Sequence, residues 1–299
     1  MKQYICIDVG GTSIKYGILE QSGRFLDTSE IPTEAHLGGP AIIEKMKSII
    51  REYLSSYTPD GICVSTAGMV DCEKGSITYA APLIPNYTGT PIREILENEF
   101  HLPSEVENDV NCAGLAEYFS GAGKNSSICL CLTIGTGIGG SIIMNGQILH
   151  GFSGSGCEIG YMHLPGGSFQ DLGASKTLVE YVTQKKGLLP GTINGKWIFE
   201  HAKSGDMDCI HAIDKMVDIL GMGIANICYV INPEIVILGG GIMAQKDYLY
   251  DKIRKSIDHY LLPTISQHTK LAFAQNQNHA GMLGAYYHFC RRHPELCED

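Results

Sequence analysis

Residues 5–15 read I-C-I-D-V-G-G-T-S-I-K, and this stretch decides the fold. An apolar run typical of a β-strand ends at Asp8, and Gly10 and Gly11 then let the backbone reverse without a Cβ clash. A second apolar run leads away from the turn. We therefore expect a β-hairpin whose turn presents free amide groups beside a carboxylate.

Phosphate binding is the chemistry that such a turn favours. Backbone amides in a tight turn can hold phosphate oxygens, and Thr12 and Lys15 add a hydroxyl and a positive charge. Asp8 can hold Mg²⁺, directly or through water, to balance the phosphate charge. No Walker sequence is present. Taken alone, the stretch also fits a plain glycine hairpin without a ligand.

A second strand and turn of the same kind covers residues 129–140, which read C-L-C-L-T-I-G-T-G-I-G-G. A phosphate loop in each half of a chain is typical of an α/β, two-domain actin-like ATPase (ribonuclease H-like) fold. In that fold, two similar domains close on ATP from both sides of a central cleft. The ATP-contacting residues predicted in the second loop are Thr133, Ile134, Gly135, Thr136, Gly137, Ile138, Gly139 and Gly140.

Length and charge narrow the possible functions. With 299 residues, the chain fits two domains of ordinary size. We expect an N-terminal domain that carries the first phosphate loop over residues 1–120 and a C-terminal nucleotide-binding domain over residues 121–279. A closing helix within residues 280–299 is expected to pack back on the first domain. The net charge of −10 argues against a nucleic-acid partner, which needs a basic face.

The composition predicts a cytoplasmic protein with no membrane partner. The chain opens directly on a strand with no apolar signal segment, and no run approaches the ~20 apolar residues of a membrane span. The 11 cysteines are odd in number and scattered in spacing. This favours reduced thiols over disulfides, so we expect the cysteines to serve as small buried apolar side chains.

Five short motifs occur in order, each where a strand is expected to end. They are D-V-G-G-T at Asp8, E-N-D at Glu107, T-I-G-T-G-I-G-G at Thr133, C-E-I-G at Cys157 and I-N-P-E-I-V-I-L-G-G-G-I over residues 231–242. With these motifs the chain resembles the ROK sugar kinases (repressor, open reading frame, kinase) almost from end to end. The resemblance implies an ATP- and Mg²⁺-dependent kinase that acts on a small sugar and forms a homodimer.

The resemblance also assigns roles to individual residues. It makes Asp109 the catalytic base, whose carboxylate would accept the proton of the sugar hydroxyl. Asn108, Asp109 and Glu158 would bind the sugar hydroxyls, and Gly68 and Asn86 would form a wall of the sugar site. The residues assigned to the adenosine side of ATP are Gly239, Gly240 and Gly241.

Several of these residues could instead have a purely structural role, with no contact to a ligand. Asp109 could instead cap the helix expected to begin near Asn111. Asn86 could be only a turn former in the loop expected over residues 78–87. The glycines at 239–241 could be no more than a tight turn from a strand into the next helix, and residues 146–160 could be a mobile ligand loop or plain surface turns.

Residues 160–176 depart from the family pattern. Most members carry G-H and then a C-x-C-G-x-x-G-C cluster that binds structural zinc, whereas this chain reads G-Y-M-H-L-P-G-G-S-F-Q-D-L-G-A-S-K. His163 alone cannot form a tetrahedral site, so we expect no structural zinc site. Phe169 and Leu172 are expected to hold this region by packing instead.

Tyr161 stands where the family has a histidine, and we expect it to contact the sugar through its hydroxyl or its ring, with packing as the alternative. The G-G-T-x-x-K spacing and the ending N-x-A-G-x-L-G-A-x-Y-H-F at 278–289 are similar to the β-glucoside kinase subgroup. Those enzymes phosphorylate the 6-hydroxyl of the non-reducing glucose of β-glucosides such as cellobiose. Glucokinase and N-acetylmannosamine kinase activity are the alternatives within the family.

Two alternatives fall outside catalysis. A sugar-responsive repressor would need a DNA-reading domain, and the first strand is expected to begin by Tyr4, which leaves no room for one before it. A non-catalytic sugar-sensing regulator is the second alternative. The presence of Asp8, Asp109 and both glycine loops argues against it.

Overall fold

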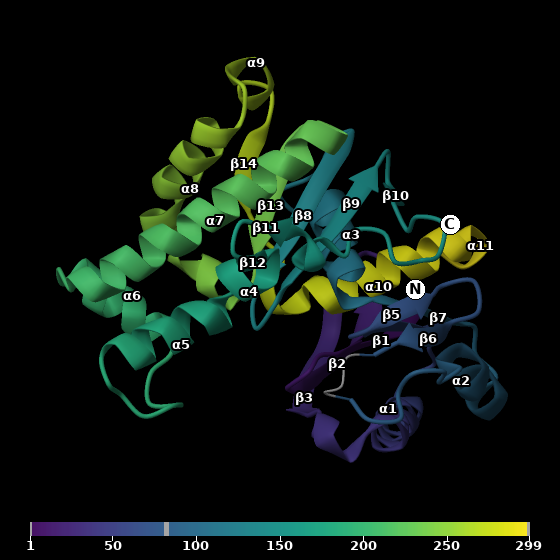
Figure 1. The fold of residues 1–299 in the computed structure, drawn as a ribbon. Coiled ribbons are helices and arrows are strands. Elements are labelled where there is room, and N and C mark those ends of the chain that lie inside the picture. Colours follow the sequence, from purple (N-terminus) through teal and green to yellow (C-terminus); the bar gives the residue numbers. More distant parts are fainter. Residues whose placement is uncertain (1, 81–83, 298–299) are drawn as a thin grey trace. The chain divides into compact units, whose positions relative to one another are not determined.

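The computed structural model describes residues 2–80 and 84–297, and the chain divides into two compact units (Figure 1). Unit 1 comprises Met1–Ser120, Ile148–Gly156 and Asn278–Asp299. Unit 2 comprises Gly121–Gln147 and Cys157–Gln277. The short segment at 148–156 thus groups with unit 1, although it lies between two parts of unit 2 in the sequence.

Unit 1 combines one mixed sheet with helices from both ends of the chain. Its elements are β1 (Gln3–Val9), β2 (Ser13–Glu20), β3 (Phe25–Pro32), η1 (Ala35–Leu37), α1 (Gly39–Leu54), β4 (Gly61–Thr66), β5 (Met69–Asp71), β6 (Ser76–Tyr79), α2 (Ile92–Phe100), β7 (Ser104–Asn108), α3 (Asp109–Ser120), α10 (Ala280–Arg292) and α11 (Pro294–Cys297).

Unit 2 has its own mixed sheet and a long central helix. Its elements are β8 (Ile128–Ile134), β9 (Ile138–Met144), β10 (Gln147–Ile148), η2 (Ile159–Tyr161), β11 (His163–Leu164), β12 (Gly167–Ser168), α4 (Phe169–Gly173), α5 (Ser175–Lys185), α6 (Gly195–Lys203), α7 (Met207–Ile231), β13 (Ile235–Gly239), η3 (Gly241–Gln245), α8 (Lys246–Tyr260), α9 (Pro263–Ser266), β14 (Lys270–Phe273) and η4 (Gln277–His279), of which β10 and η4 end in residues of unit 1.

The two five-stranded sheets follow one plan. Their strand orders are β3-β2-β1-β4-β7 and β10-β9-β8-β13-β14. In each, the strand before a glycine turn pairs antiparallel with the strand after it, and parallel with a strand from later in the chain. The repeat that the two glycine turns predicted therefore extends to the topology of both units.

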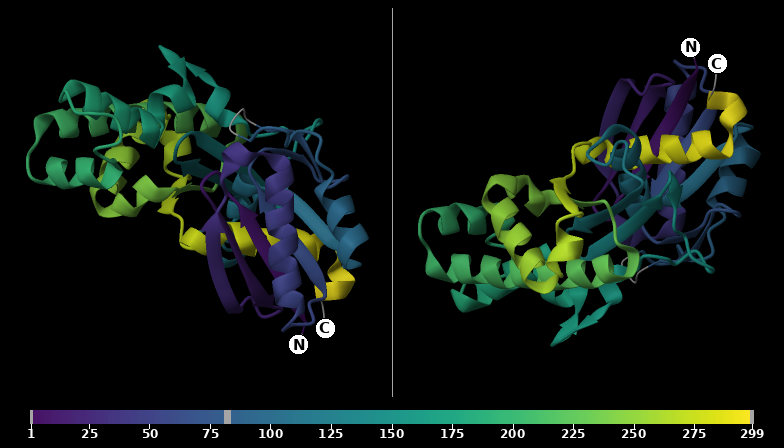
Figure 2. Two further views of the ribbon diagram at one scale, coloured as in Figure 1. Left: turned by 90° about the horizontal axis from the view of Figure 1, so that it is seen from below. Right: turned by 90° about the horizontal axis from the view of Figure 1, so that it is seen from above.

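Strand β1 explains why a carboxylate ends up at the edge of the unit 1 sheet. Its alternate residues Ile5, Ile7 and Val9 pack in one core cluster with residues of α1 and α2. Tyr4 and Cys6 point to the opposite face, where they pack with residues of α3 and α10. Because side chains alternate along a strand, Asp8 shares the face of Tyr4 and Cys6. Helix α10 packs against the sheet of unit 1 on this face (Figure 2).

In unit 2, the core lies between the sheet and α7. Phe169 is fully buried there, and Leu172 is partly buried against the same cluster. A Cβ on Gly223 of α7 would lie 2.5 Å from the Phe169 ring, so the glycine lets the ring approach the helix backbone. These two side chains pack as expected for a region without the family's cysteine cluster.

Most expected helices form within three residues of their expected ends, among them α1, α5, α7 and α8. The glycines at 239–241 do not open α8 directly, because Gly239 completes β13 and η3 intervenes. Residues 81–83 of the expected surface loop lie outside the described residues. Within the part of the chain that the structure describes, no helix is both long and apolar enough to cross a bilayer.

The expectation that every cysteine is a free thiol is wrong for one pair. Cys290 and Cys297 form a disulfide with their Cα atoms 5.3 Å apart. The two cysteines are seven residues apart, on α10 and on the short helix α11 that follows it, and their spacing alone did not indicate a pair. Most of the other cysteines are buried free thiols, with Cys72 and Cys157 only partly buried.

Candidate functional site

The first glycine turn places Asp8 against two polar partners. Strand pairing sets Asp8 opposite Ser65 of β4 and Lys15 of β2, and Ser65 Oγ donates a hydrogen bond of 2.6 Å to Asp8 Oδ1. Burial raises the pKa of Asp8, although the Ser65 hydrogen bond and the Lys15 charge act in the opposite direction. Lys15 Nζ also lies 3.5 Å from Asn278 Oδ1.

Glycine 281, at the start of α10, makes room for this carboxylate. A Cβ at Gly281 would lie 2.2 Å from Asp8 Cγ and 2.4 Å from both carboxylate oxygens. Sequence reasoning gave neither Ser65 nor Gly281 a role beside Asp8, because neither is near Asp8 in the chain, although Gly281 belongs to the ending at 278–289. Both residues determine where the Asp8 carboxylate lies.

The turn after β1 is tight, and a missing Cβ matters at Gly10 but not at Gly11. Gly10 N donates to Ser13 O over 3.0 Å, and Thr33 Oγ1 donates to Gly10 O over 2.6 Å. Neither Gly10 nor Gly11 has a positive φ. A Cβ on Gly11 would meet nothing within 4 Å, and Thr12 is exposed. A Cβ on Gly10 would lie 3.1 Å from Ser13 O, so Gly10 avoids a close contact as expected, whereas Gly11 keeps the surface of the turn open.

The E-N-D motif lies where β7 passes into α3. Asn108 Oδ1 accepts hydrogen bonds from Val110 N at 2.9 Å and Asn111 N at 3.1 Å, which is the N-cap geometry. Asp109 Oδ1 accepts from Val110 N at 2.9 Å and from Asn108 Nδ2 at 3.0 Å. Asn108 is thus the principal cap of α3, a role that the sequence alone left open for Asp109.

The two residues predicted to form a wall of the sugar site lie in the turn after β4 and in the loop before α2. Asn108 Nδ2 donates to Gly68 O over 2.9 Å. Gly68 has φ +103°, and a Cβ there would lie 2.9 Å from Tyr79 O, so only glycine fits without strain. Asn86 is exposed with φ +55°, as a turn former is. Tyr87 beside it is fully buried, and its hydroxyl lies 2.7 Å from Thr66 Oγ1.

Glu107, the first residue of the motif, belongs to a buried polar network that sequence reasoning missed. Its Oε2 lies 2.7 Å from His150 Nε2 and accepts from Cys72 Sγ at 3.1 Å. Burial alone would raise the pKa of Glu107, but the His150 hydrogen bond and the charges of His288 and His150 together lower it to about 2. Its Oε1 accepts from Asn108 N at 2.7 Å, which links the network to the motif.

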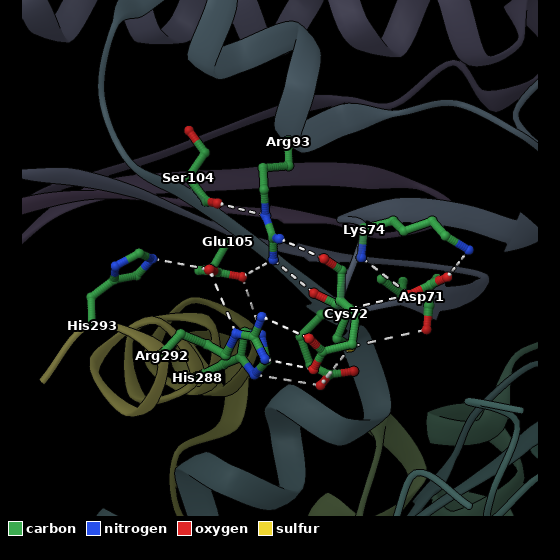
Figure 3. A network of polar contacts seen from close by, with 12 residues as sticks. Asp71, Cys72, Lys74, Arg93, Ser104, Glu105, His288, Arg292 and His293 are labelled. Atoms are coloured by element: carbon green, nitrogen blue, oxygen red, sulfur yellow. Dashed lines mark hydrogen bonds and ion pairs between the residues drawn. The ribbon is translucent and has the colours of Figure 1, made fainter. Parts of the chain in front are cut away.

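The network continues through Glu105, two residues earlier on β7 (Figure 3). Arg93 forms an ion pair with Glu105 Oε2, and His293 Nε2 lies 3.0 Å from Glu105 Oε1. Arg292 and His288 approach the same carboxylate from α10. Strand β7 therefore carries two buried carboxylates, and each is surrounded by cationic or imidazole groups.

In unit 2, the second glycine turn has an exposed surface, and hydrogen bonds hold its backbone. The eight predicted residues run from the end of β8 into β9, and Gly135 N donates to Gly137 O over 2.9 Å. Ser175 N and Oγ both donate to Gly135 O, at 3.0 and 2.6 Å. A Cβ on Gly135 would meet nothing within 4 Å, whereas one on Gly140 would lie 2.4 Å from Ile159 Cδ1.

The glycines at 239–241 approach the same turn from β13. Gly240 has φ +100°, and a Cβ there would lie 2.2 Å from Ile134 O. A Cβ on Gly241 would meet nothing within 4 Å, so this position is open. Gly239 ends β13 in register with Thr133. The structure therefore brings these two predicted segments together within unit 2.

A cavity of about 670 Å³ adjoins the second turn. It is lined by Thr136, by one face of α5 that includes Val179 and Thr183, and by the segment at 188–194. Its volume lies in the range usual for small-molecule sites, roughly 300–1,000 Å³. Sequence reasoning placed no ligand against α5, because no motif marks that helix.

The other two predicted sugar ligands lie in unit 2, on either side of Ile159 and Gly160. Glu158 is exposed, and Tyr161 N donates to Glu158 O over 3.2 Å. The Tyr161 side chain is 53% exposed. The packing alternative for Tyr161 is thereby disfavoured, because its ring is available to a ligand.

Comparison with known proteins gives a consistent result. The model of the ROK family matches residues 4–291. An uncharacterised protein of Clostridium perfringens is 50% identical, over 97% of this chain and 98% of its own. A glucokinase of Halalkalibacterium halodurans is 31% identical, over 94% of this chain and 93% of its own. A β-glucoside kinase of Klebsiella pneumoniae is 30% identical, over 94% of each chain.

Solved structures resemble the fold equally closely. A Listeria monocytogenes protein proposed to be an N-acetylmannosamine kinase superimposes with a TM-score of 0.88 and 30% identity, over 97% of this chain and 99% of its own. A ROK family glucokinase from Streptomyces griseus, in complex with glucose and AMPPNP, gives a TM-score of 0.83 and 27% identity, over 95% and 97%. The α/β, actin-like ATPase fold predicted from the two glycine turns is confirmed.

Proposed function

This chain belongs to the ROK family and is a carbohydrate kinase, and on that premise we propose that it transfers the γ-phosphoryl group of ATP to the 6-hydroxyl of a β-glucoside such as cellobiose. One observation carries the proposal. β1, β4 and β7 run parallel, so Asp8, Gly68 and Asp109 gather at the carboxyl edge of one sheet, where α/β proteins bind ligands.

The residues present fit ATP and Mg²⁺. Asp8 offers a carboxylate fixed by Ser65, and the open positions at Gly11, Gly135 and Gly241 leave backbone free for phosphate oxygens. When bound, Mg²⁺ neutralises phosphate charge. The cavity beside α5 has the size and the largely apolar lining that suit an adenosine group, so we assign it to the nucleoside end of ATP.

Asp109 accepts the proton of the attacking sugar hydroxyl in this proposal. The Asn108 side chain, which caps α3, also holds Asp109 Oδ1 through its Nδ2 and so orients the carboxylate. Orientation matters because phosphoryl transfer depends mainly on positioning and electrostatic stabilisation. Asn108, Gly68 and Asn86 of unit 1, and Glu158 and Tyr161 of unit 2, are the proposed sugar contacts.

A substrate panel tests the function. Purified protein with ATP and Mg²⁺ is offered glucose, cellobiose, arbutin, salicin, N-acetylmannosamine and fructose, and phosphate transfer is measured by coupled ADP release. We expect the largest kcat/KM for the β-glucosides. A preference for glucose or N-acetylmannosamine would replace the substrate class but keep the kinase, whereas no transfer to any of these sugars would contradict the enzyme.

Tyr161 is expected to contribute to sugar affinity through its exposed ring. Tyr161→Ala should raise KM for the β-glucoside about fivefold, which corresponds to ~1 kcal/mol of lost aromatic contact. KM for ATP should stay at the parent value. Tyr161→Phe is the matched control, because it keeps the ring and loses only the hydroxyl. Equal losses in both variants would assign the contact to the hydroxyl instead.

Two further properties are proposed, the first from the resemblance and the second from the sequence composition. The chain is proposed to act as a homodimer, which size-exclusion chromatography with light scattering tests directly. A monomer across the micromolar range would contradict it. A cytoplasmic location is proposed as well, and fractionation of cells that express the untagged chain would check it.

A further inference from the structure

Three potential metal ligands converge on one carboxylate oxygen of Glu107 in unit 1, and that oxygen is a fourth potential ligand. Glu107 Oε2 lies 3.1 Å from Cys72 Sγ, 2.7 Å from His150 Nε2 and 3.5 Å from His288 Nδ1. Cys72 Sγ lies 3.6 Å from His150 Nε2. Ligand atoms of Cys72, Glu107 and His288 all lie within 4.8 Å of one another. Glu107 and His288 are buried, whereas Cys72 and His150 are partly exposed.

The separations measured from Glu107 Oε2 and Cys72 Sγ are close to those of a tetrahedral metal site. Among the described residues, the group whose ligand atoms all lie within 4.8 Å of one another is Cys72, Glu107 and His288, so His150 would complete the set by moving toward His288. Nitrogen and oxygen ligands about 2.0 Å from Zn²⁺, and sulfur about 2.3 Å from it, lie roughly 3.3–3.5 Å apart at tetrahedral angles. Three of the four observed separations, 3.1, 3.5 and 3.6 Å, agree within a few tenths of an ångström. The fourth, between Glu107 and His150, is shorter because those groups are hydrogen-bonded.

We propose that Cys72, Glu107, His150 and His288 bind a structural Zn²⁺ ion. Thiolate, imidazole and carboxylate together form a ligand set that suits zinc. The ligands come from the segment after β5, from β7, from the segment at 148–156 and from α10. The ion would therefore cross-link four separate segments of unit 1, including the short excursion at 148–156.

The surroundings of the cluster resemble the outer shell of a metal site. The other carboxylate oxygen, Glu107 Oε1, accepts hydrogen bonds from Asn108 N at 2.7 Å and from Asn111 Nδ2 at 3.0 Å. That leaves Oε2 to face the other three ligands. His288 Nε2 is buried without a hydrogen-bond partner and lies 3.8 Å from Glu105 Oε2. Ligating histidines usually donate a hydrogen bond from their second nitrogen to a carboxylate. Glu105 lies on that side of His288, but at 3.8 Å it is beyond hydrogen-bond distance.

The charges also balance. On binding, Cys72 releases its thiol proton to solvent, while His150 keeps its proton on Nδ1 and His288 keeps its proton on Nε2. One thiolate and one carboxylate then neutralise the two positive charges of Zn²⁺, which avoids an unpaired charge in the interior. The absence of a cysteine cluster at 160–176 has no bearing on this set, whose members lie far apart in the sequence.

Metal content tests the proposal directly and needs no activity assay. Full-length protein without a histidine tag is purified without chelator, and zinc is measured by plasma mass spectrometry. We expect one zinc per chain in the parent, and at least a tenfold loss in Cys72→Ala and in His288→Gln. The matched controls are Cys63→Ala, another buried cysteine of unit 1, and His293→Gln, which contacts Glu105 but not Glu107. Both should keep the zinc.

A cobalt measurement on the parent protein covers the case in which the ligand variants fail to fold. After removal of zinc by dialysis against a chelator, added Co²⁺ should give a thiolate-to-cobalt charge-transfer band and strong visible bands of a tetrahedral ion. A parent protein that contains no zinc and gives no charge-transfer band would contradict the metal site. The four side chains would then be joined only by hydrogen bonds and ion pairs. Zinc retained at the parent level in Cys72→Ala would contradict the metal site as well.

Discussion

Asp109→Asn is expected to fold, to bind sugar weakly and to lose about 10²–10⁴-fold in kcat, the usual cost of removing a general base. That loss corresponds to about 3–5 kcal/mol of transition-state stabilisation. Asparagine has nearly the same shape, and its side-chain oxygen can still accept from Val110 N, as Asp109 Oδ1 does. It cannot accept the proton of the sugar hydroxyl.

The N-cap of α3 does not depend on Asp109, so a loss of kcat in Asp109→Asn can be separated from a loss of helix stability. Because Asn108 Oδ1 already accepts from Val110 N and Asn111 N, the helix keeps its N-cap when Asp109 changes. Asp206→Asn is the matched control, since the Asp206 side chain accepts from Asp208 N and Cys209 N at the N-cap of α7. We expect Asp206→Asn to lower the melting temperature slightly and to leave kcat near the parent value.

The two measurements, a melting curve and kcat, separate the two roles of Asp109. A helix-terminal role alone predicts that Asp109→Asn behaves like the Asp206 control, with a small loss of stability and turnover within a few-fold of the parent. Such a result would remove Asp109 from catalysis. Glu158 would then be the next carboxylate to test.

The sequence predicted the features that depend on neighbours in the chain. Local sequence patterns determine the two glycine turns, at Gly10 and Gly11 and at Gly135 and Gly137, and most of the helices. Their positions could therefore be predicted from the sequence. The shared topology of the two sheets followed from the repetition of the turn. The E-N-D motif was correctly expected at the end of a strand.

What the sequence did not reveal depends on contacts between distant segments. Ser65 and Gly281 position Asp8 only because β4 pairs with β1 and α10 crosses the sheet. Asn108 rather than Asp109 is the principal N-cap of α3, because the helix begins at Asp109, two residues before the expected start at Asn111. The cluster around Glu107 joins residues that are up to 216 positions apart, from 72 to 288, and no spacing motif could indicate it.

Gly281→Ala is expected to lower kcat/KM for MgATP by at least tenfold, or about 1.4 kcal/mol. In a helix interior, alanine is ordinarily more stable than glycine by ~1 kcal/mol, so a loss at this position points to a clash. The new Cβ would lie 2.2 Å from Asp8 Cγ. Because the Ser65 hydrogen bond and the strand backbone hold Asp8, its carboxylate must move away from the position proposed for binding Mg²⁺.

Gly284→Ala, one turn further along α10, is the matched control. Its Cβ would lie 1.8 Å from Cys112 O, so it meets the backbone of α3 and not Asp8. Overpacking of this kind costs about 1–3 kcal/mol of stability, and we expect a lower melting temperature with an unchanged Mg²⁺ dependence of turnover. Gly281→Ala should instead shift that dependence to higher Mg²⁺. If Gly281→Ala keeps the Mg²⁺ dependence and kcat/KM of the parent, then Asp8 does not hold the ion, and the carboxylate beside Gly281 has only a structural role.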